Sequence, residues 1–560
     1  MMTDSTIRGQ ALTESEFGPL TLPGFFREVC RRNGDKEAMV FVTARDGEPG
    51  ERYTYRQLWN ESCSLSRALI ARGVTKDVRV GLLATNRPEW VIAAFAIAMA
   101  GGTCVALSTF AKRDELEYLL RIGDVSLLIV ERSIIERDFL AELIQICPEL
   151  ATSVGIAYSA RLPFLRRVVC IGDGAAPCGA FESWREVLQG DLKAPGTLME
   201  AIEKEIAPTD RAMVFFSSGS TAKPKAVLHT HRAAAIQCWR WSRIVAIDPD
   251  VRTWTANGFF WSGNFTQAVG STLSAGGCLV LQRFFDPGEA LGLMQIERVT
   301  YPIAWPHQWA RLAEHPVYSE VNLSSLRYVG ETSPLRTHPT VRADWNEPMA
   351  CYGNTETLTL STAHCSGTPR EISEGNHGVP LHGMTLRIVD PLTGKVLNRN
   401  QNGEIAVKGP TLMLGYLRVP PEETFDDEGF FRTGDGGYVD DQGRLHWQGR
   451  LNDIIKTGGA NVSPLEIDAV LADCPGVKIG ATVGVPHDKL GEMVVACVVP
   501  ETGATVDEAA VRSYLSQRLS SYKVPRRVLV IQESDLSLTS SNKVKTAPLR
   551  ELAARQLAER

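Results

Sequence analysis

Short apolar runs alternate with longer amphipathic segments through most of the first 380 residues. The runs are rich in β-branched residues, and each is followed by a turn-rich or helical stretch, which is typical of strands layered against helices. The clearest expected strands are residues 78–83, 127–130, 168–171, 212–216, 278–281 and 327–329. We therefore predict an α/β fold whose large N-terminal domain contains two α/β subdomains.

The pattern changes twice further along the chain. Residues 378–438 are strand-like and rich in glycine and proline, which predicts a β-rich subdomain. After Gly449 we expect a helix, two strands, a helix and a last strand, at residues 464–473, 479–485, 493–499, 507–519 and 527–531. These elements suffice for a small α+β domain. We place a hinge at 450–453, which gives domains 1–449 and 450–560.

Residues 90–107 (WVIAAFAIAMAGGTCVAL) come closest to the length of a membrane span. Gly101 and Gly102 divide this segment into a helix-sized piece and a strand-sized piece. It is therefore expected to be a buried helix that leads into a buried strand, and we expect no membrane span.

Composition narrows the class of protein. A chain of 560 residues exceeds what one hydrophobic core usually supports, so at least two domains are expected. Its formal charge of −6 gives no basic field for a nucleic acid. Twelve cysteines without a C-x-x-C pair argue against a zinc site or a disulfide framework. The first ten residues show no signal-peptide pattern. We expect a cytoplasmic enzyme.

The segment from Phe216 to Ala226 (FSSGSTAKPKA) combines hydroxyl groups, a glycine and lysines between two apolar runs. Such a loop suits a polyanion, because backbone amides, hydroxyls and ammonium groups converge in it. An ordinary exposed loop has a similar composition. It is not the motif G-x-x-x-x-G-K-[ST], since alanine follows Lys225. The expected phosphate-binding residues are Ser217, Ser218, Gly219, Ser220, Thr221 and Lys225.

Four further clusters carry chemistry. Residues 351–356 (CYGNTE) offer a ring, a hydroxyl and a carboxylate that could stack a base, contact a phosphate and hold Mg²⁺. Residues 431–435 (FRTGD) end in a carboxylate suited to ribose hydroxyls. Residues 449–466 lie at the expected domain boundary, and residues 538–545 place a lysine in a polar loop. Taken singly, each cluster also fits a purely structural role.

In this order, the five segments resemble the superfamily of adenylate-forming enzymes, which includes acyl-CoA and aryl-CoA ligases, nonribosomal adenylation domains and beetle luciferases. The resemblance runs from residues 52–58 (RYTYRQL) and 86–90 (NRPEW) to Lys543. It implies a large N-terminal domain and a small, mobile C-terminal lid. It also implies a two-step reaction, in which a carboxylate and ATP give acyl-AMP and a thiol then takes the acyl group.

The resemblance assigns roles position by position. Thr355 would contact the α-phosphate, Glu356 would hold Mg²⁺, Asn452 would be the hinge, and Lys543 would bridge the α-phosphate and the carboxylate. The implied nucleotide-binding residues are Gly330, Glu331, Thr332, Tyr352, Gly353, Asp435 and Arg450. Attack of one anion on another needs positive charge at the reacting oxygens, which Lys543 and Mg²⁺ would supply. Lid rotation would then remove Lys543 before the thiol arrives.

The acceptor is expected to be coenzyme A. The segment GGANVSP after Lys456 resembles CoA ligases more than luciferases or carrier-loading domains, and Gly458 and Gly459 would let a pantetheine arm pass close to the backbone. Lys456 is included among the expected catalytic residues. A luciferase-like oxygenase and a non-catalytic nucleotide or acyl-adenylate sensor remain alternatives.

Three windows match the acyl pocket of the relatives, at residues 254–267, 301–309 and 354–362. They carry many aromatic rings and little charge, which favours an apolar, bulky or aromatic acid. The rings could instead fill the pocket and restrict it to short acids. The expected pocket residues are Phe259, Phe260, Trp261, Phe265 and Trp305.

Ala222 and Ala226 stand where relatives commonly have glycine. If the backbone were left-handed there, each alanine would cost about 1 kcal/mol, and its methyl group could crowd the phosphates. Acyl-AMP lacks the β- and γ-phosphates, so the second half-reaction would be spared. One hypothesis is therefore an enzyme that uses acyl-AMP made by a separate adenylating enzyme. The alternative is an enzyme that performs both steps.

Overall fold

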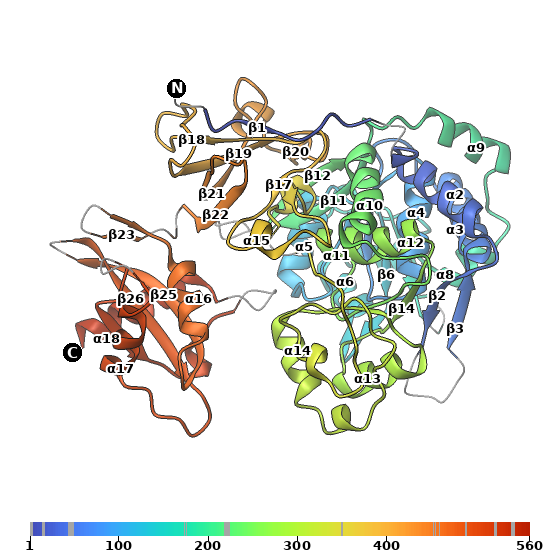
Figure 1. Ribbon diagram of the computed structural model, residues 1–560. Helices are drawn as coiled ribbons and strands as arrows, with labels where there is room; N and C mark the ends of the chain where they lie inside the picture. The colour runs from blue at the N-terminus through green and yellow to red at the C-terminus, as the bar shows by residue number, and fades with distance from the viewer. Residues whose placement is uncertain are drawn as a thin grey trace. The chain divides into compact units, whose positions relative to one another are not determined.

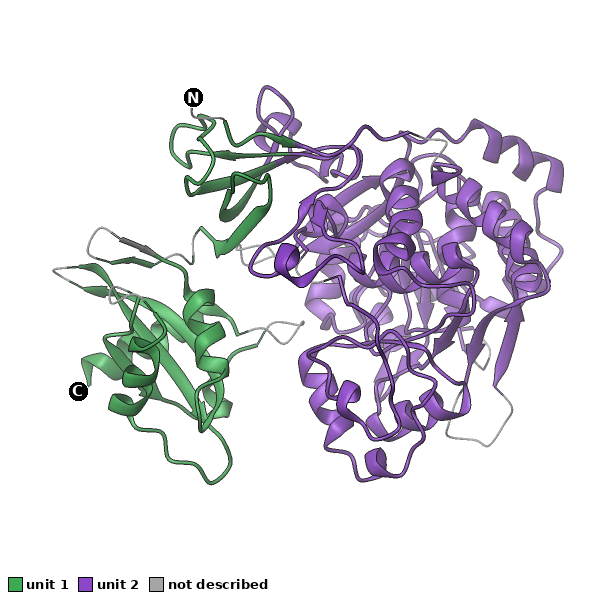
Figure 2. Cartoon of the chain, in the orientation of Figure 1, with its two compact units in different colours: residues 1–7, 386–406, 432–560 green, residues 8–385, 407–431 purple. Residues whose placement is uncertain are grey.

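The computed structural model describes residues 4–559 apart from 14–16, 43–49, 173, 175, 218–223, 349–350, 452, 454, 458–459, 488–489, 520–522 and 539–543. The chain forms two compact units (Figure 2). The larger unit contains Arg8–Thr385 and Val407–Phe431, and the smaller contains Met1–Ile7, Leu386–Ala406 and Arg432–Arg560.

The larger unit is built around an eight-stranded sheet with the order β10-β9-β6-β4-β5-β11-β12-β20. The six strands from β10 to β11 are parallel, and β12 and β20 continue antiparallel. The strands are β4 Arg79–Leu83, β5 Thr103–Ala106, β6 Leu127–Glu131, β9 Arg167–Ile171, β10 Phe181–Ser183, β11 Arg211–Ser217, β12 Lys225–Thr230 and β20 Gly415–Tyr416. Four of the predicted strands are confirmed here.

Helices cover both faces of this sheet, because alternate residues of each strand point to opposite sides. Leu82 and Phe215 belong to one hydrophobic core. Its helices are α2 Leu22–Asn33, α3 Tyr55–Ala71, α4 Pro88–Met99 and α10 His231–Val245, which Figure 1 labels. Leu83 and Val214 join a second core with α5 Arg113–Ile122 and α6 Phe139–Ile146.

The segment 90–107 forms most of α4 and all of β5, as predicted, and every residue of α4 except Glu89 is buried. Among the described residues, no helix is both long and apolar enough to cross a membrane.

A five-stranded sheet of the larger unit has the order β15-β13-β14-β2-β3. Its strands are β2 Glu37–Phe41, β3 Glu51–Thr54, β13 Arg252–Thr255, β14 Cys278–Leu281 and β15 Tyr301–Ile303, and α13 Pro287–Ile296 and α14 Pro306–Ala313 pack against it. The predicted strand 278–281 is confirmed. The predicted strand 327–329 is wrong. The amides of Arg327 and Tyr328 both donate to the Thr300 carbonyl, so no ladder continues.

Two more five-stranded sheets follow. The first is the predicted β-rich region, with β1 Ile7–Arg8, β18 Thr385–Val389, β19 Gly403–Lys408, β21 Phe431–Val439 and β22 Leu445–Arg450. The second contains β23 Ile455–Thr457, β24 Ala460–Val462, β25 Val477–His487, β26 Gly491–Pro500 and β27 Arg527–Val530, with helices α16 Pro464–Ala472, α17 Glu508–Ser516 and α18 Thr546–Ala558. The α+β elements expected after Gly449 are thereby confirmed, whereas the boundary at 450–453 stays a prediction.

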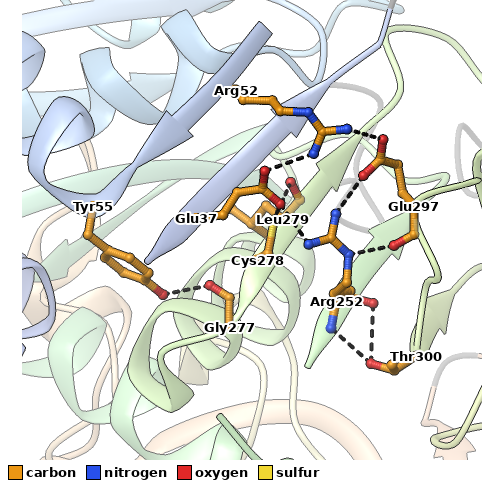
Figure 3. A network of polar contacts seen from close by, with 9 residues as sticks. All are labelled: Glu37, Arg52, Tyr55, Arg252, Gly277, Cys278, Leu279, Glu297 and Thr300. Atoms are coloured by element: carbon orange, nitrogen blue, oxygen red, sulfur yellow. Dashed lines mark hydrogen bonds and ion pairs between the residues drawn. The ribbon is translucent and has the colours of Figure 1, made fainter. Parts of the chain in front are cut away.

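Four charged side chains form a ring of ion pairs that joins strands β2, β3 and β13 of the five-stranded sheet β15-β13-β14-β2-β3 (Figure 3). Glu37 accepts from Arg52 at 2.8 Å and from Arg252 at 2.7 Å. Glu297, which follows α13, accepts from Arg52 at 2.5 Å and from Arg252 at 2.6 Å. The side chain of Glu297 is only 5% exposed, so its charge depends on both arginines.

Replacing Glu297 by glutamine is expected to lower the free energy of unfolding by about 1–2 kcal/mol, because the amide places an N–H donor where a buried carboxylate oxygen accepted from a guanidinium group. Arg52 and Arg252 keep 52% and 22% of their side-chain surface, so water compensates part of the lost charge. Urea denaturation of the wild type and the variant measures this change. The control is Asp35→Asn, which removes an exposed ion pair with Arg56 and should change the free energy of unfolding much less. Equal losses in the two variants would contradict a structural role for the ring.

Candidate functional site

The glycine- and hydroxyl-rich segment connects two paired strands. Ser217 at the end of β11 lies opposite Lys225 at the start of β12. Residues Ser218, Gly219, Ser220, Thr221 and Ala222 lie outside the described residues. The Ser217 hydroxyl is buried and has no hydrogen-bond partner in the described part of the chain. Lys225 is exposed, with its Nζ 4.7 Å from the centroid of the Tyr416 ring.

Ala226 does not have the backbone that would make alanine costly. It belongs to β12, pairs with Phe216, and is absent from the residues with positive φ. Its side chain is 1% exposed and packs in the core with Val214 and Leu228. The left-handed backbone considered for this position is therefore wrong, and the methyl group lies in the hydrophobic core. The hypothesis that an alanine in this segment impairs ATP binding therefore rests on Ala222 alone.

The cluster 351–356 forms a turn in which one position needs glycine. Tyr352 is 5% exposed and forms an antiparallel bridge with Thr362. A Cβ on Gly353 would lie 2.0 Å from the carbonyl oxygen of Thr359, so glycine is required. Asn354 caps the short 3₁₀ helix η4 (Thr355–Thr357), and its Nδ2 is buried without a hydrogen-bond partner among the described residues.

Hydrogen bonds from β20 and from the segment just before it hold Glu356 in place. The Tyr416 hydroxyl donates to its Oε1 at 2.8 Å, and the Met413 amide donates to its carbonyl at 2.7 Å. Since β20 pairs with β12, Tyr416 links the carboxylate to the ammonium group of Lys225. The sequence does not point to Tyr416, because no motif marks a tyrosine 60 residues away from its partner.

Residues Gly330, Glu331 and Thr332 form a turn beside Glu347. The Glu331 amide donates to the Glu347 carboxylate at 3.1 Å, and a Cβ on Gly330 would lie 2.5 Å from the same oxygen. A larger residue at 330 would therefore displace the Glu347 side chain. Burial raises the pKa of Glu347. Glu331 and Thr332 are exposed, so their side chains are accessible to a ligand.

Asp435 and Arg450 lie opposite each other on β21 and β22 of the smaller unit. Arg450 Nε is 3.1 Å from Asp435 Oδ1, and another guanidinium nitrogen donates to the Thr433 carbonyl at 2.8 Å. Asp435 is 3% exposed, and its amide donates to the Thr433 hydroxyl at 3.1 Å. The structure thus brings together the two residues expected to bind ribose.

The remaining C-terminal candidates are partly described. Lys456 lies in β23 with an exposed side chain, and its amide donates to Glu492 at 2.8 Å. The hinge residue Asn452, the paired glycines Gly458 and Gly459, and Lys543 lie outside the described residues. Val544, directly after Lys543, bridges to Leu538.

The aromatic candidates fall into two groups. Phe259 and Phe265 have no accessible surface and pack on Trp90, with ring centroids 5.4 Å and 6.1 Å away. A side chain that no water-sized probe reaches borders no cavity, so in this conformation both serve as core packing. Phe260 keeps 5% exposure, and Trp261 and Trp305 are half-buried. The pocket role of all five residues stays a prediction.

Comparison with known protein families settles the family. The model of the AMP-binding enzyme matches residues 26–417, and that of the AMP-binding enzyme C-terminal domain matches residues 466–543. The chain belongs to the AMP-binding enzyme family. The α/β class, the large N-terminal domain and the small C-terminal domain are thereby confirmed.

Relatives of this AMP-binding enzyme include several CoA ligases. The chain is 30% identical over 542 residues to 3-[(3aS,4S,7aS)-7a-methyl-1,5-dioxo-octahydro-1H-inden-4-yl]propanoyl:CoA ligase of Mycobacterium tuberculosis (95% of this chain, 99% of the relative). It is 29% identical to feruloyl-CoA synthase of Amycolatopsis sp (86% and 90%). The fold matches the anthranilate CoA ligase AuaEII with a TM-score of 0.78 at 24% identity (98% and 100%). The enzyme stands in the acyl-CoA ligase branch, whose members are acid–thiol ligases.

The side chains of this AMP-binding enzyme fit a phosphate compound with Mg²⁺. The hydroxyl of Ser217 and the amide nitrogen of Asn354 are buried polar groups without a hydrogen-bond partner among the described residues, as expected for groups that face a polar ligand. No group of three or more His, Cys, Asp or Glu side chains in the described ranges could hold a metal. One carboxylate, Glu356, suits Mg²⁺, which is commonly held by one or two carboxylates, phosphate oxygens and water.

Proposed function

We propose that this enzyme joins an apolar, bulky carboxylic acid to coenzyme A through an acyl-adenylate and that it performs both half-reactions with ATP. The observation that carries the proposal is the arrangement of Lys225, Tyr416 and Glu356, which gathers a cation, a hydroxyl and a carboxylate beside the β11–β12 connection. Transfer of the adenylyl group to a carboxylate needs such fixed charges and dipoles at the reacting oxygens.

Each candidate residue has a proposed task. The β11–β12 connection binds the β- and γ-phosphates, Thr355 contacts the α-phosphate, and Glu356 holds Mg²⁺. When bound, Mg²⁺ neutralises phosphate charge. Lys543 supplies positive charge to the α-phosphate and the attacking carboxylate. Lys456 is a catalytic residue once the lid has rotated. The nucleotide is held by Gly330, Glu331, Thr332, Tyr352, Gly353, Asp435 and Arg450, and the pantetheine arm by Gly458 and Gly459.

The strand conformation of Ala226 supports the proposal that the enzyme retains adenylation. Its side chain packs in the core from an ordinary strand, so one of the two reasons for doubting ATP use is removed. An alanine at 222 alone leaves the other groups of the loop in place, including Ser217 and Lys225. A separate enzyme that supplies acyl-AMP is therefore the less economical hypothesis.

A ring-bearing acid is supported by two observations. Phe260, Trp261 and Trp305 retain accessible surface in a region with little charge. Two of the relatives at about 30% identity are named for a bicyclic propanoate and for ferulate. We propose a substrate in which a ring system carries a carboxylate, since aromatic side chains offer such a ring a large apolar contact.

The test measures CoA thioester formation from a panel of ring-bearing acids with ATP and, separately, from their synthetic acyl-adenylates. Comparable turnover from both sources supports the two-step enzyme. Turnover from acyl-AMP alone, with ATP use recovered in Ala222→Gly, would instead establish an enzyme limited to the second half-reaction. Oxygen uptake without CoA would show luciferase-like chemistry, and inertness toward every acyl-AMP would sink the ligase proposal.

Replacing Tyr416 by phenylalanine is expected to raise the Mg²⁺ concentration for half-maximal adenylation about tenfold, because the Glu356 carboxylate loses the hydroxyl that orients it. ATP–pyrophosphate exchange over a Mg²⁺ series measures the effect. Tyr318→Phe is the control, since its hydroxyl bonds the Pro334 carbonyl at 2.9 Å, away from Glu356. An unchanged Mg²⁺ dependence in Tyr416→Phe would rule out this coupling.

A further inference from the structure

The turn that carries Thr355 and Glu356 continues into a strained backbone. Leu358 has a φ of 50° and Thr359 a φ of 90°, in the region that side chains with a Cβ seldom adopt. A branched residue such as Thr359 pays an appreciable conformational energy there. The surrounding structure must therefore hold this stretch in place, and the groups that hold it are candidates for positioning the turn.

One glutamine contacts the carbonyl groups on the C-terminal side of Glu356. Gln237 lies on α10 and has no accessible surface. Its Nε2 donates to the carbonyl oxygens of Thr357 at 3.3 Å, Leu358 at 2.7 Å and Leu360 at 3.0 Å. These bonds span the residues with positive φ, so a single side-chain amide stabilises the strained segment.

A buried arginine fixes the orientation of this amide. Arg240, one helical turn along α10, donates to Gln237 Oε1 at 3.4 Å and to the His382 carbonyl at 2.8 Å. Arg240 is 4% exposed and pairs with no carboxylate in the described part of the chain. Burial lowers the pKa of Arg240 to about 9, so it still carries a proton at neutral pH. Its donors oblige Gln237 to turn its oxygen toward Arg240 and its nitrogen toward the turn.

A histidine holds the N-terminal side of the same turn. His229 on β12 is fully buried, and its Nε2 lies 2.9 Å from the Thr355 carbonyl oxygen. Burial lowers the pKa of His229 to about 3, so the ring is neutral at working pH. A carbonyl only accepts, and so Nε2 carries the proton and donates. Side chains from two elements thus hold the backbone on both sides of Glu356.

We propose that Gln237 is a positioning residue, oriented by Arg240, that acts with His229 to hold the Thr355–Glu356 turn in its reactive geometry. The proposal rests on the roles of Thr355 and Glu356 proposed above. Gln237 does not touch the reacting atoms. It acts through the carbonyl groups of residues 357, 358 and 360, and its loss lets the turn relax away from the strained backbone.

The test replaces Gln237 by methionine, which keeps the length of the side chain and removes both donors. The rate constant of ATP–pyrophosphate exchange is expected to fall about 10²-fold, as displacements of about 1 Å do in active sites. The Mg²⁺ concentration for half-maximal exchange should rise by about tenfold, because Glu356 is displaced.

The matched control is Gln282→Met. Gln282 is equally a buried glutamine, with bonds to the Trp254 ring at 3.2 Å and the Asp286 carbonyl at 3.0 Å, and it does not contact the turn. It should match Gln237→Met in lost thermal stability and keep the wild-type Mg²⁺ dependence. Equal Mg²⁺ shifts in the two variants would reduce Gln237 to a packing residue and overturn the proposal.

A double-mutant cycle separates this proposal from the proposed function. If Gln237 positions the turn that carries Glu356, the effect of Gln237→Met on exchange is smaller in a Glu356→Gln background, and the part that remains comes from the displacement of Thr355. Full additivity of the two changes overturns the positioning role. If Glu356→Gln alone keeps wild-type exchange, the proposed role of Glu356 fails first. If Glu356→Gln is inactive while Gln237→Met exchanges like wild type, only the positioning role fails.

Discussion

Replacing Lys543 by alanine is expected to slow adenylation by about 10²–10³-fold and to leave the conversion of supplied acyl-AMP into acyl-CoA within about threefold of wild type. The first step brings a carboxylate toward the α-phosphate, and an ammonium group between the two anions stabilises the charge that develops there. In the second step the thiol attacks the acyl carbon, the bond between that carbon and the bridging oxygen breaks, and AMP leaves with this oxygen. This step needs no cation between two anions, so Lys543 has no comparable task in it.

The two halves are measured separately, by ATP–pyrophosphate exchange with the acid and by thioester formation from synthetic acyl-AMP and CoA. Lys545→Ala is the control, because Lys545 is an exposed lysine two residues away and its removal should change neither rate by more than about twofold. Equal losses in both half-reactions for Lys543→Ala would show a shared or structural role. An unchanged exchange rate would place the catalytic cation elsewhere.

Strand positions were predictable from the sequence where the pattern is local. The strand 278–281 was predicted to the residue, and the helix–strand division at Gly101 and Gly102 was also correct, because apolar runs and glycine breaks decide both. The wrong strand at 327–329 has an apolar pattern, but the amides of Arg327 and Tyr328 share one acceptor, the Thr300 carbonyl, and do not form a ladder. Pairing depends on tertiary position, which a local pattern does not contain.

The residues of the candidate site, like the strands, could be predicted only where they lie close together in the sequence. Motifs such as 351–356 keep their residues close in sequence, so these side chains could be singled out together from the sequence. The residues that orient them come from far away in the chain, and no spacing rule connects Gln237, His229 and Tyr416 to them. For Ala226 the motif led to a wrong expectation. Its position in a motif suggested a special backbone, while its register in β12 makes it an ordinary core residue.

Replacing Asp435 by asparagine is expected to raise the KM for ATP and the KM for acyl-AMP by about 10–10² each, because both nucleotides carry the ribose that this carboxylate is proposed to bind. A hydrogen bond to a charged acceptor contributes about 1.5–3 kcal/mol, and asparagine also offers a donor where Arg450 already donates. Unlike Lys543→Ala, this variant should impair both half-reactions, since the ribose is present in each.

The control is Asp440→Asn. Asp440 is another buried aspartate of the same sheet region, which accepts from Arg444 at 2.7 Å and lies 2.9 Å from the His446 ring. It should cost stability and leave both KM values within about twofold of wild type. If Asp435→Asn lowers kcat without changing either KM, the carboxylate acts on the reacting groups and not on the ribose. If both variants behave alike, the Asp435–Arg450 pair serves the fold alone, and the ribose must be held by residues outside β21 and β22.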